Sequence, residues 1–300
     1  MKLPFTFTKD LLYLHLAVLL WGFTGLFGKE IALSQVALVW WRMLFTVFFF
    51  LIVLVITKKP IWVPRPHRPA AALTGFLIML HWLCFYGAIK YANISIGLSC
   101  LSCGAVVTAV LEPIHKGKKI NIINVLWGVL SVVGICIIIK FQYQYKIGIL
   151  LGITAAFLAA MFTILNSTLT QHNDPITLSM NELLYGLVGL TLLLPIYHTS
   201  YPEVGLLPTL RDVHLLLVFS SLCTCLPFVL SMLAMRTLSA FAVTLSVNLE
   251  PVYGILAAFW FYQEYQQLDK GFWVGSFFII CSVVGYIVHS HTSKSHTIGQ

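Results

Sequence analysis

The feature that most constrains the fold is a series of about ten apolar runs that fill almost all of this 300-residue chain. Runs of roughly 20 apolar residues are long enough to cross the hydrocarbon core of a membrane as α-helices. Hydrophobic residues make up 59% of the chain and charged residues only 9%, whereas soluble domains carry roughly 25% charged residues. The runs are continuous rather than alternating at every second residue, which favours helices over a β-barrel. The sequence therefore predicts an all-α membrane protein.

Polar residues and prolines separate the predicted spans. The two longest connections run from Lys58 to Pro69 and from Thr199 to Asp212, and their prolines indicate surface loops. The other connections are short, so no soluble domain is expected between the spans. The predicted spans are residues 11–31, 34–57, 70–89, 92–112, 120–140, 147–169, 177–198, 213–235, 238–262 and 270–289.

Two short stretches follow the same pattern in the two halves of the chain. Residues 88–91 (Ala-Ile-Lys-Tyr) and residues 234–237 (Ala-Met-Arg-Thr) each lie between two apolar runs, 146 positions apart. We predict two five-helix units, residues 1–145 and 146–300, related as an internal repeat. Because five is odd, the second unit enters the membrane in the opposite sense, which gives an inverted repeat. Such repeats can open alternately to either side of a central site, so the pattern favours a carrier over a channel.

Basic residues predict the orientation of the chain in the membrane. An even number of spans places both termini on one side, and this side carries the basic clusters at 58–68 and 116–119. Because Lys and Arg collect in cytoplasmic loops, we predict a multi-pass protein of the cytoplasmic (inner) membrane with both termini in the cytoplasm. Loops thus account for the formal net charge of +8, and no nucleic-acid partner is expected.

The sequence lacks the motifs of enzymes and cofactor-binding proteins that act within membranes. It contains no HExxH, GxSxG or GxxxxGK[ST] pattern, and no aspartate falls inside a predicted span. The seven cysteines lie in apolar runs, where buried thiols behave as small hydrophobes. Cys100 and Cys103 have CxxC spacing but lack the βαβ context of a redox site. We expect no enzymatic activity, no cofactor and no metal site.

A set of short motifs extends over the whole chain: residues 88–93 (Ala-Ile-Lys-Tyr-Ala-Asn), 234–239 (Ala-Met-Arg-Thr-Leu-Ser), 249–252 (Leu-Glu-Pro-Val) and 262–264 (Tyr-Gln-Glu), with Gly128, Gly134, Gly275 and Gly285 in the last helix of each unit. In order and spacing these motifs resemble those of the EamA-type exporters of the drug/metabolite transporter superfamily, which have ten helices. The resemblance implies transport of a small solute across the cytoplasmic membrane, from a range that includes amino acids, sugars, nucleosides and drugs. The chain departs from strict symmetry at one point, because Glu250-Pro251 aligns with Gly104-Ala105.

Glu250 is the most unusual residue inside a predicted span, because a charge at the centre of a membrane helix costs about 2.5–3.5 kcal/mol. Pro251 follows it, interrupts the helical hydrogen bonds and frees a carbonyl group, so that carbonyl, Asn248 and Glu250 can meet at a cavity. One interpretation is a site for a substrate ammonium group or a proton. The other is a protonated glutamate that bonds a neighbouring helix and holds a kink. Glu112, at the end of the fourth span, is expected to pair with Lys116 at the interface instead.

Arg42 also admits two interpretations. It opens the second span beside Trp40 and Trp41, where aromatic residues collect and an arginine can extend to water as an interface anchor. Alternatively, its two-pronged guanidinium suits a clamp for a substrate carboxylate or phosphate. In the second unit, Asn181 and Glu182 occupy the positions equivalent to Trp41 and Arg42. A cation in one half and an anion in the other would suit a zwitterion.

A histidine and several aromatic residues complete the candidate site. His81 and Trp82 lie in the middle of the third span, and Tyr86 follows one turn later. Because histidine titrates near neutral pH, His81 is a candidate proton relay; otherwise it is an interior histidine held by a hydrogen bond. Trp21 and Tyr185 are candidates either for the wall of an apolar cavity or for plain packing.

Together these features predict a secondary transporter that moves a small organic solute, such as an amino acid or a related metabolite, by alternating access. We expect export with proton coupling as the favoured energy source. The alternatives are a multidrug efflux carrier, and a lipid-carrier flippase or accessory scaffold of the same fold. The expected partners are the solute and the lipid bilayer, and the protein is expected to be a monomer or a homodimer. The candidate substrate-binding residues are Arg42, Trp82, Tyr86, Glu182, Asn248 and Glu250, and the candidate proton-coupling residues are Glu250 and His81.

Overall fold

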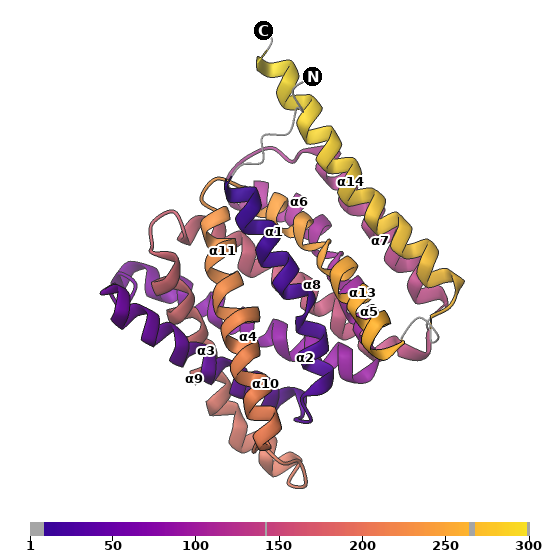
Figure 1. The fold of residues 1–300 in the computed structure, drawn as a ribbon. Coiled ribbons are helices and arrows are strands. Elements are labelled where there is room, and N and C mark those ends of the chain that lie inside the picture. The colour runs from indigo at the N-terminus through magenta and orange to yellow at the C-terminus, as the bar shows by residue number, and fades with distance from the viewer. Residues whose placement is uncertain (1–8, 142, 264–267, 299–300) are drawn as a thin grey trace.

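The fold is a bundle of helices, seen in a computed structural model that describes residues 9–141, 143–263 and 268–298 (Figure 1). Every regular element in these ranges is helical. Eight helical stretches within them are long and apolar enough to cross a membrane. Two shorter apolar helices, Ile122–Ile138 and Lys270–Tyr286, occupy the places of the fifth and tenth predicted spans. The prediction of an all-α, multi-pass membrane protein is confirmed.

In the first half of the chain, the first and fourth predicted spans are each divided into two helices. A short 3₁₀ turn, η1 (Arg65–His67), ends the proline-containing loop before the third span. The helices are α1 (Lys9–Gly22), α2 (Thr24–Glu30), α3 (Gln35–Thr57), α4 (Arg68–Tyr91), α5 (Ile94–Leu101), α6 (Gly104–His115) and α7 (Ile122–Phe141).

In the second half, the eighth span contains a π-helical turn and the ninth is divided into two helices. The last helix continues past the predicted end at residue 289 to Ile298. The elements are η2 (Tyr143–Tyr145), α8 (Lys146–Leu169), α9 (Pro175–Ser200), α10 (Leu210–Ser220), η3 (Ser221–Cys225), α11 (Leu226–Ala234), α12 (Ala240–Val247), α13 (Glu250–Tyr262) and α14 (Lys270–Ile298).

The two halves divide their fourth span at the same place. α5 and α12 begin 146 positions apart, and so do α6 and α13. The N-caps of α5 and α12, Asn93 and Ser239, have the same spacing, and each accepts a hydrogen bond from a backbone N–H of the first turn, that of Ile96 or Ala242. Such caps stabilise the start of a helix. The repeat inferred from residues 88–91 and 234–237 is therefore present in the backbone.

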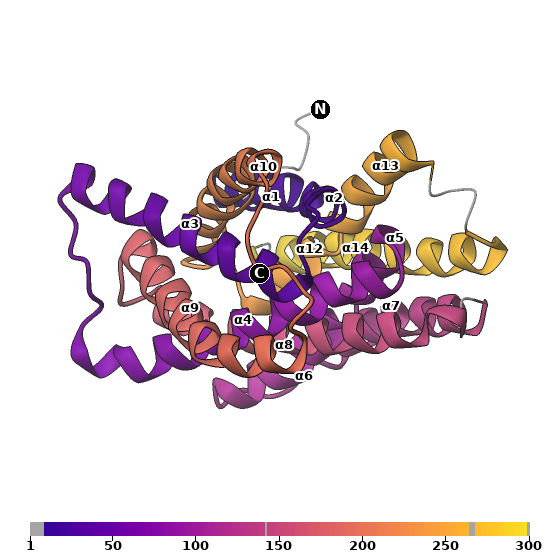
Figure 2. The ribbon, with the colours of Figure 1, turned by 90° about the horizontal axis from the view of Figure 1, so that it is seen from below.

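Glycines allow several helices to approach closely. α7 and α14, the last helices of the two halves, lie side by side (Figure 1), and a Cβ on Gly134 would lie 2.5 Å from the carbonyl oxygen of Gly275. α9 packs against both α3 and α4 (Figure 2). There, a Cβ on Gly75 would lie 2.0 Å from the carbonyl oxygen of Glu182. Close packing of this kind stabilises membrane helices, because lipid supplies no hydrophobic force between them.

The loop between α3 and α4 is attached to the start of α9. Lys59 pairs with Asp174 at 2.6 Å, and the Asn181 side-chain amide donates a hydrogen bond of 2.7 Å to the carbonyl of Ile61. Asn181 therefore faces this loop. Its amide also donates a 2.8 Å hydrogen bond to the carbonyl of Thr177 within α9.

The molecule has two ends with different contacts. The start of α1 and the end of α14 lie at one end (Figure 1), which we call the terminal face; α6 also ends there, and α7 and α12 begin there. The other end, the opposite face, is closed by polar contacts. Arg211 and the Tyr262 hydroxyl both donate to Glu30, and Asp212 accepts a 3.1 Å hydrogen bond from the backbone N–H of Ala32.

Candidate functional site

A cavity of about 100 Å³ lies in the middle of the bundle, between the two halves of the chain. Its walls come from α1 to α5 in the first half and from α8 and α11 to α13 in the second. Trp21 lines it, whereas Tyr185 packs in an adjacent hydrophobic cluster. Two other lining residues, Asn166 and Met235, belong to the ends of helices that finish at the terminal face. The cavity therefore extends from the centre of the bundle toward that face.

Arg42 supplies a cation to this cavity and is only 2% exposed. Its Nε donates to Oγ1 of Thr224 at 2.9 Å, and its Nη1 donates to the hydroxyl of Tyr86. The guanidinium carbon lies 3.8 Å from the ring centroid of Trp82 and 4.2 Å from that of Phe219, and such contacts stabilise a desolvated cation. A guanidinium carries five N–H donors. Two of them have the partners named above, and among the described residues the others are available to an acceptor in the cavity.

The burial of Arg42 contradicts its interpretation as an interface anchor. α3 begins at Gln35, so Arg42 lies about two turns inside the helix and faces the bundle. Its two aromatic neighbours point elsewhere: Trp40 donates to the Thr191 hydroxyl at 2.9 Å, and Trp41 donates to the carbonyl of Leu206 at 2.8 Å. Trp40, Trp41 and Arg42 are neighbours in the sequence, but only Arg42 lines the cavity.

The π-helical turn η3 brings Thr224 to Arg42. The Thr224 hydroxyl donates a 3.0 Å hydrogen bond to the carbonyl of Phe219, five residues earlier, while its oxygen accepts from Arg42. The Ser220 hydroxyl donates to the carbonyl of Arg42 at 3.2 Å. π-Helical turns are frequent at functional sites. Here the π-helical turn holds the Arg42 guanidinium of α3 in place through Thr224.

Glu250 supplies an acid to the same cavity and is 6% exposed. The Thr24 hydroxyl lies 3.4 Å from its Oε1. Glu250 is the first residue of α13, and a negative charge is stabilised at the N-terminus of a helix. Within the described residues, Glu250 and Arg42 line one cavity without forming an ion pair. A basic group and an acidic group therefore share a small space without direct contact.

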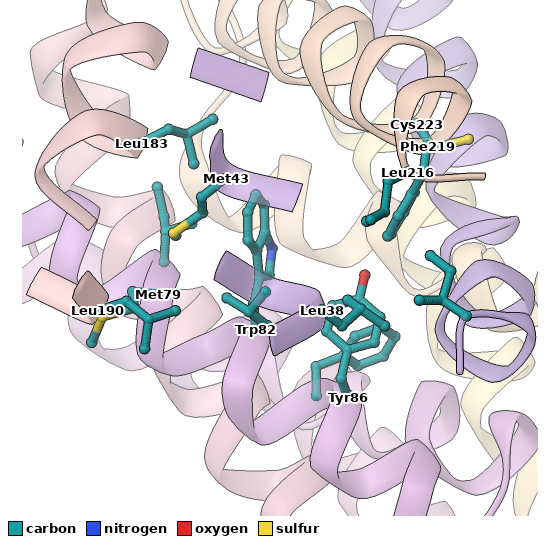
Figure 3. Packing of buried hydrophobic residues seen from close by; sticks show 14 of the residues in the cluster. Leu38, Met43, Met79, Trp82, Tyr86, Leu183, Leu190, Leu216, Phe219 and Cys223 are labelled. Atoms are coloured by element: carbon teal, nitrogen blue, oxygen red, sulfur yellow. The ribbon is translucent and has the colours of Figure 1, made fainter. Parts of the chain in front are cut away.

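His81 and aromatic rings form much of the remaining wall. The His81 Nδ1 lies 2.8 Å from the carbonyl oxygen of Ala155. Because a carbonyl only accepts, Nδ1 donates this hydrogen bond, and Nε2 is left for another partner. Trp82 and Tyr86 lie one turn apart on α4 (Figure 3), and the Trp82 ring packs edge-on against Phe228 with centroids 5.9 Å apart. An apolar wall with a few polar groups is typical of a small-molecule site.

Two of the predicted site residues do not line this cavity. Glu182 is fully buried on α9, and its Oε2 accepts a 3.3 Å hydrogen bond from the amide of Asn166, which does line the cavity. Asn248 lies between α12 and α13 and borders a second, more apolar pocket of about 230 Å³ beside α14. Of the predicted residues, the structure brings together Arg42, His81, Trp82, Tyr86 and Glu250.

The sequence analysis missed the small polar residues of the site. Hydroxyl side chains are common packing residues in membrane helices, so their functional positions are hard to recognise. One usable signal is the Ser220-Ser221 pair followed by Thr224 and Pro227 inside an apolar run, since serine and proline favour irregular helix geometry. The missed lining residues are Thr24, Thr163, Asn166, Ser231 and Thr244.

Comparisons with known proteins agree with this architecture. The sequence profile of the EamA-like transporter family matches residues 8–140 and again residues 146–288, one match in each predicted half. An uncharacterized transporter of Archaeoglobus fulgidus is 24% identical over 189 residues, which make up 62% of this chain and 68% of the relative. One solved crystal structure is similar in fold, with a TM-score of 0.68 and 13% identity over 92% of this chain and 96% of that chain.

Proposed function

The chain belongs to the EamA-like transporter family, and we propose that it is a secondary carrier for a small zwitterionic solute, an amino acid or a related metabolite. Carriers built from inverted repeats bind their solute near the centre of the membrane and expose it alternately to the two sides. The residues proposed to contact the solute are Arg42, Trp82, Tyr86 and Glu250.

The observation that supports this proposal is the presence of a buried guanidinium and a buried carboxyl group in one cavity. A buried guanidinium with unused donors is costly until an acceptor arrives, and a solute carboxylate meets this need with two parallel hydrogen bonds to Arg42. An ammonium group on the same solute is attracted to Glu250. A zwitterion satisfies both groups, whereas a neutral solute satisfies neither.

The aromatic wall favours a second candidate, a hydrophobic cationic drug. Such a solute would stack on Trp21, Trp82 and Phe228 and bind Glu250 without using Arg42. The cavity volume of about 100 Å³ favours the smaller solute, since sites for drug-sized ligands measure roughly 300–1,000 Å³.

The proposed source of energy is a proton gradient, and Glu250 is the residue proposed to exchange the proton. A protonated Glu250 has no charge to attract an ammonium group, so proton and solute compete for this residue. Competition of this kind is what an antiporter needs, because the proton that enters displaces the solute that leaves. The other titratable side chains proposed to face Glu250 across the cavity are Arg42, His81 and Tyr86, and His81 is the second candidate for proton transfer through its Nε2.

Glu182 and Asn248 have indirect roles in this proposal. Glu182 orients Asn166, which faces the solute. Asn248 lies two residues before Glu250, and neither its amide oxygen nor its amide nitrogen has a hydrogen-bond partner among the described residues. Its amide is therefore available to Glu250 or to the solute when the junction between α12 and α13 changes shape.

The direction of transport is proposed from the position of the cavity. The cavity extends toward the terminal face, which carries the basic loops and which we assign to the cytoplasm. The contacts of Glu30 close the opposite face. This arrangement suits a carrier of the cytoplasmic membrane that accepts solute from the cytoplasm and releases it outside.

Transport into proteoliposomes tests the proposal. The protein is reconstituted under an imposed pH gradient and offered radiolabelled amino acids, nucleosides and a hydrophobic cationic dye. We expect transport of one or more amino acids. We expect Arg42→Gln to weaken their apparent affinity about 100-fold, because hydrogen bonds to a charged group contribute about 1.5–3 kcal/mol each. Arg42→Lys keeps the charge without the two-pronged geometry. Its apparent affinity should lie between that of the unmodified protein and that of Arg42→Gln.

Arg65→Gln is the matched control, since it removes an arginine that is exposed in the loop between α3 and α4. Its affinity for the solute should stay within two-fold of the unmodified protein. Unchanged amino-acid affinity in Arg42→Gln would exclude the carboxylate clamp. Transport of the dye alone would contradict the zwitterion and favour a hydrophobic cation as the solute. Transport of no member of the panel would overturn the proposed solute class.

A further inference from the structure

A second polar site lies at the terminal face, apart from the central cavity. It is a pocket of about 200 Å³ that forms where α6 ends and where α7 and α12 begin. Three lysines line it, Lys116, Lys118 and Lys119, together with Glu112 and Ser239. Both halves of the chain contribute to this basic pocket, because α6 and α7 belong to the first half and α12 belongs to the second.

The acid of the basic pocket is already paired. Glu112 accepts hydrogen bonds of 2.9 Å and 2.7 Å from the backbone N–H groups of Ala240 and Phe241. It also forms an ion pair of 2.7 Å with Lys116, as expected from the sequence. Its charge therefore caps the start of α12 and balances Lys116, and none is left to balance the other two lysines.

Lys118 and Lys119 give the pocket two uncompensated positive charges. Both residues are exposed, and neither side chain has a hydrogen-bond or ion-pair partner in the part of the chain that the structure describes. The Ser239 hydroxyl accepts from the backbone N–H of Ala242 and keeps its own hydrogen to donate. The Asn124 amide also faces the pocket. Two cations and two side chains able to donate hydrogen bonds therefore remain, so the pocket suits an anion.

The position of the pocket indicates the kind of anion. Its neighbours in the chain are large apolar side chains on the outer surface: Ile114 of α6 is 59% exposed, and Ile122 and Leu126 of α7 are 65% and 60% exposed. In a membrane such side chains face lipid, and the polar ends of these helices lie at the level of the headgroups. Basic pockets between membrane helices on the cytoplasmic side bind phospholipid headgroups. We propose that this pocket binds the headgroup of an anionic phospholipid.

A bound headgroup would connect the two halves of the carrier at the terminal face. It would neutralise Lys118 and Lys119 beside the contact that Glu112 makes with α12. α12 in turn carries Val243 and Thr244 of the central cavity. The lipid would therefore stabilise the junction between the halves, whatever solute the cavity takes.

Lipid titration of the full-length protein tests this inference. The protein, purified in detergent, is titrated with dioctanoyl phosphatidylglycerol, with dioctanoyl phosphatidylcholine and with inorganic phosphate. Binding is followed by native mass spectrometry, and stability by the apparent melting temperature. We expect the anionic lipid to bind at least ten-fold more tightly than the zwitterionic lipid and to raise the melting temperature. Lys118→Gln/Lys119→Gln should remove at least ten-fold of that affinity.

Lys58→Gln/Arg65→Gln is the matched control, because it removes two exposed basic residues from another loop of the same face. This double variant should bind the anionic lipid as the unmodified protein does. Equal binding of the two lipids would overturn the proposal, and so would equal losses in the two double variants. Binding of inorganic phosphate as tight as that of the anionic lipid would also overturn it, since the site would then recognise a free anion.

Discussion

The two halves of the molecule divide their fourth span at equivalent residues but place different chemistry there. In the first half, α6 begins at Gly104, and a Cβ on that residue would lie 3.2 Å from both the Ala156 carbonyl oxygen and the Thr244 side chain. In the second half, α13 begins at Glu250, whose carboxyl group lines the central cavity. One division therefore allows close packing between the halves, and the other supplies a charge.

A similar difference separates Arg42 from its counterpart in the second half. Arg42 on α3 lines the cavity, whereas Glu182 on α9 lies behind Asn166. The duplicated backbone thus provides two similar frames, and the substitutions between them provide an asymmetric site. A binding site for an asymmetric solute needs this kind of departure from symmetry, so the differences between the repeats are more informative about function than the similarities.

The largest expected effect comes from Glu250→Gln. This variant removes the acidic group at the start of α13, so that α13, like α6 at Gly104, begins with an uncharged residue. The glutamine keeps the size of the side chain but cannot exchange a proton. We expect solute accumulation driven by an imposed pH gradient to fall at least ten-fold, because general acid–base groups contribute roughly 100-fold or more when a proton must move. Counterflow exchange of labelled for unlabelled solute should persist only at higher solute concentrations, because the glutamine, like a protonated Glu250, has no charge to attract the ammonium group. Both are measured in proteoliposomes.

Glu203→Gln is the control for this comparison, because Glu203 is an exposed acid in the loop between α9 and α10. Its gradient-driven accumulation should stay within a few-fold of the unmodified protein, since substitutions at exposed residues usually change energies by less than about 0.5 kcal/mol. Full gradient-driven accumulation in Glu250→Gln would show that the proton moves elsewhere, and His81→Gln would then be the next variant.

A smaller effect is expected from Glu112→Gln, which weakens the contact between α6 of the first half and the start of α12 in the second half. The neutral amide keeps one acceptor for the N–H groups of Ala240 and Phe241 but loses the charge and the pair with Lys116. We expect a loss of about 1–3 kcal/mol in the free energy of unfolding, measured by chemical unfolding in mixed micelles. Glu203→Gln, at an exposed loop residue, should change it by less than about 0.5 kcal/mol. Equal values for the two variants would mean that Glu112 does not hold α12.

The smallest effect tests whether the two divisions are energetically equivalent. Asn93→Ala and Ser239→Ala each remove the side chain that caps the helix before the division, so each should cost about 1 kcal/mol of unfolding free energy. The same unfolding measurement applies to both. A difference of more than about 1 kcal/mol between them would show that the two equivalent caps contribute unequally to the free energy of unfolding.

Much of the fold could be predicted because the membrane imposes strong local rules. Every span must be a long apolar segment, and every charge inside a span needs a reason, so Arg42 and Glu250 could be identified in advance. The surroundings of these charges could not. Thr224 reaches Arg42 through a π-helical turn in a helix 182 positions away along the chain, and a helical repeat pattern does not predict such a turn.

The direction of each side chain was the main source of error. Neighbouring residues on a helix point about 100° apart, so an alignment of α3 with α9 could pair Arg42 with Glu182 without showing which way either side chain faces. The structure directs Asn181 to the loop at Ile61, Glu182 to Asn166, and Arg42 to the cavity. Packing against neighbouring helices decides these directions.

The sequence by itself determined that the chain is a membrane protein of duplicated helices, because hydropathy and repetition are properties of local residues in lipid. It also determined where charge enters the apolar spans. Only the tertiary structure decided that Arg42, Glu250 and His81 share one cavity while Glu182 does not. The physical reason is that a cavity consists of distant segments whose rotations are fixed by close contacts, such as that between Gly75 and the carbonyl of Glu182, and these contacts form only in the assembled bundle.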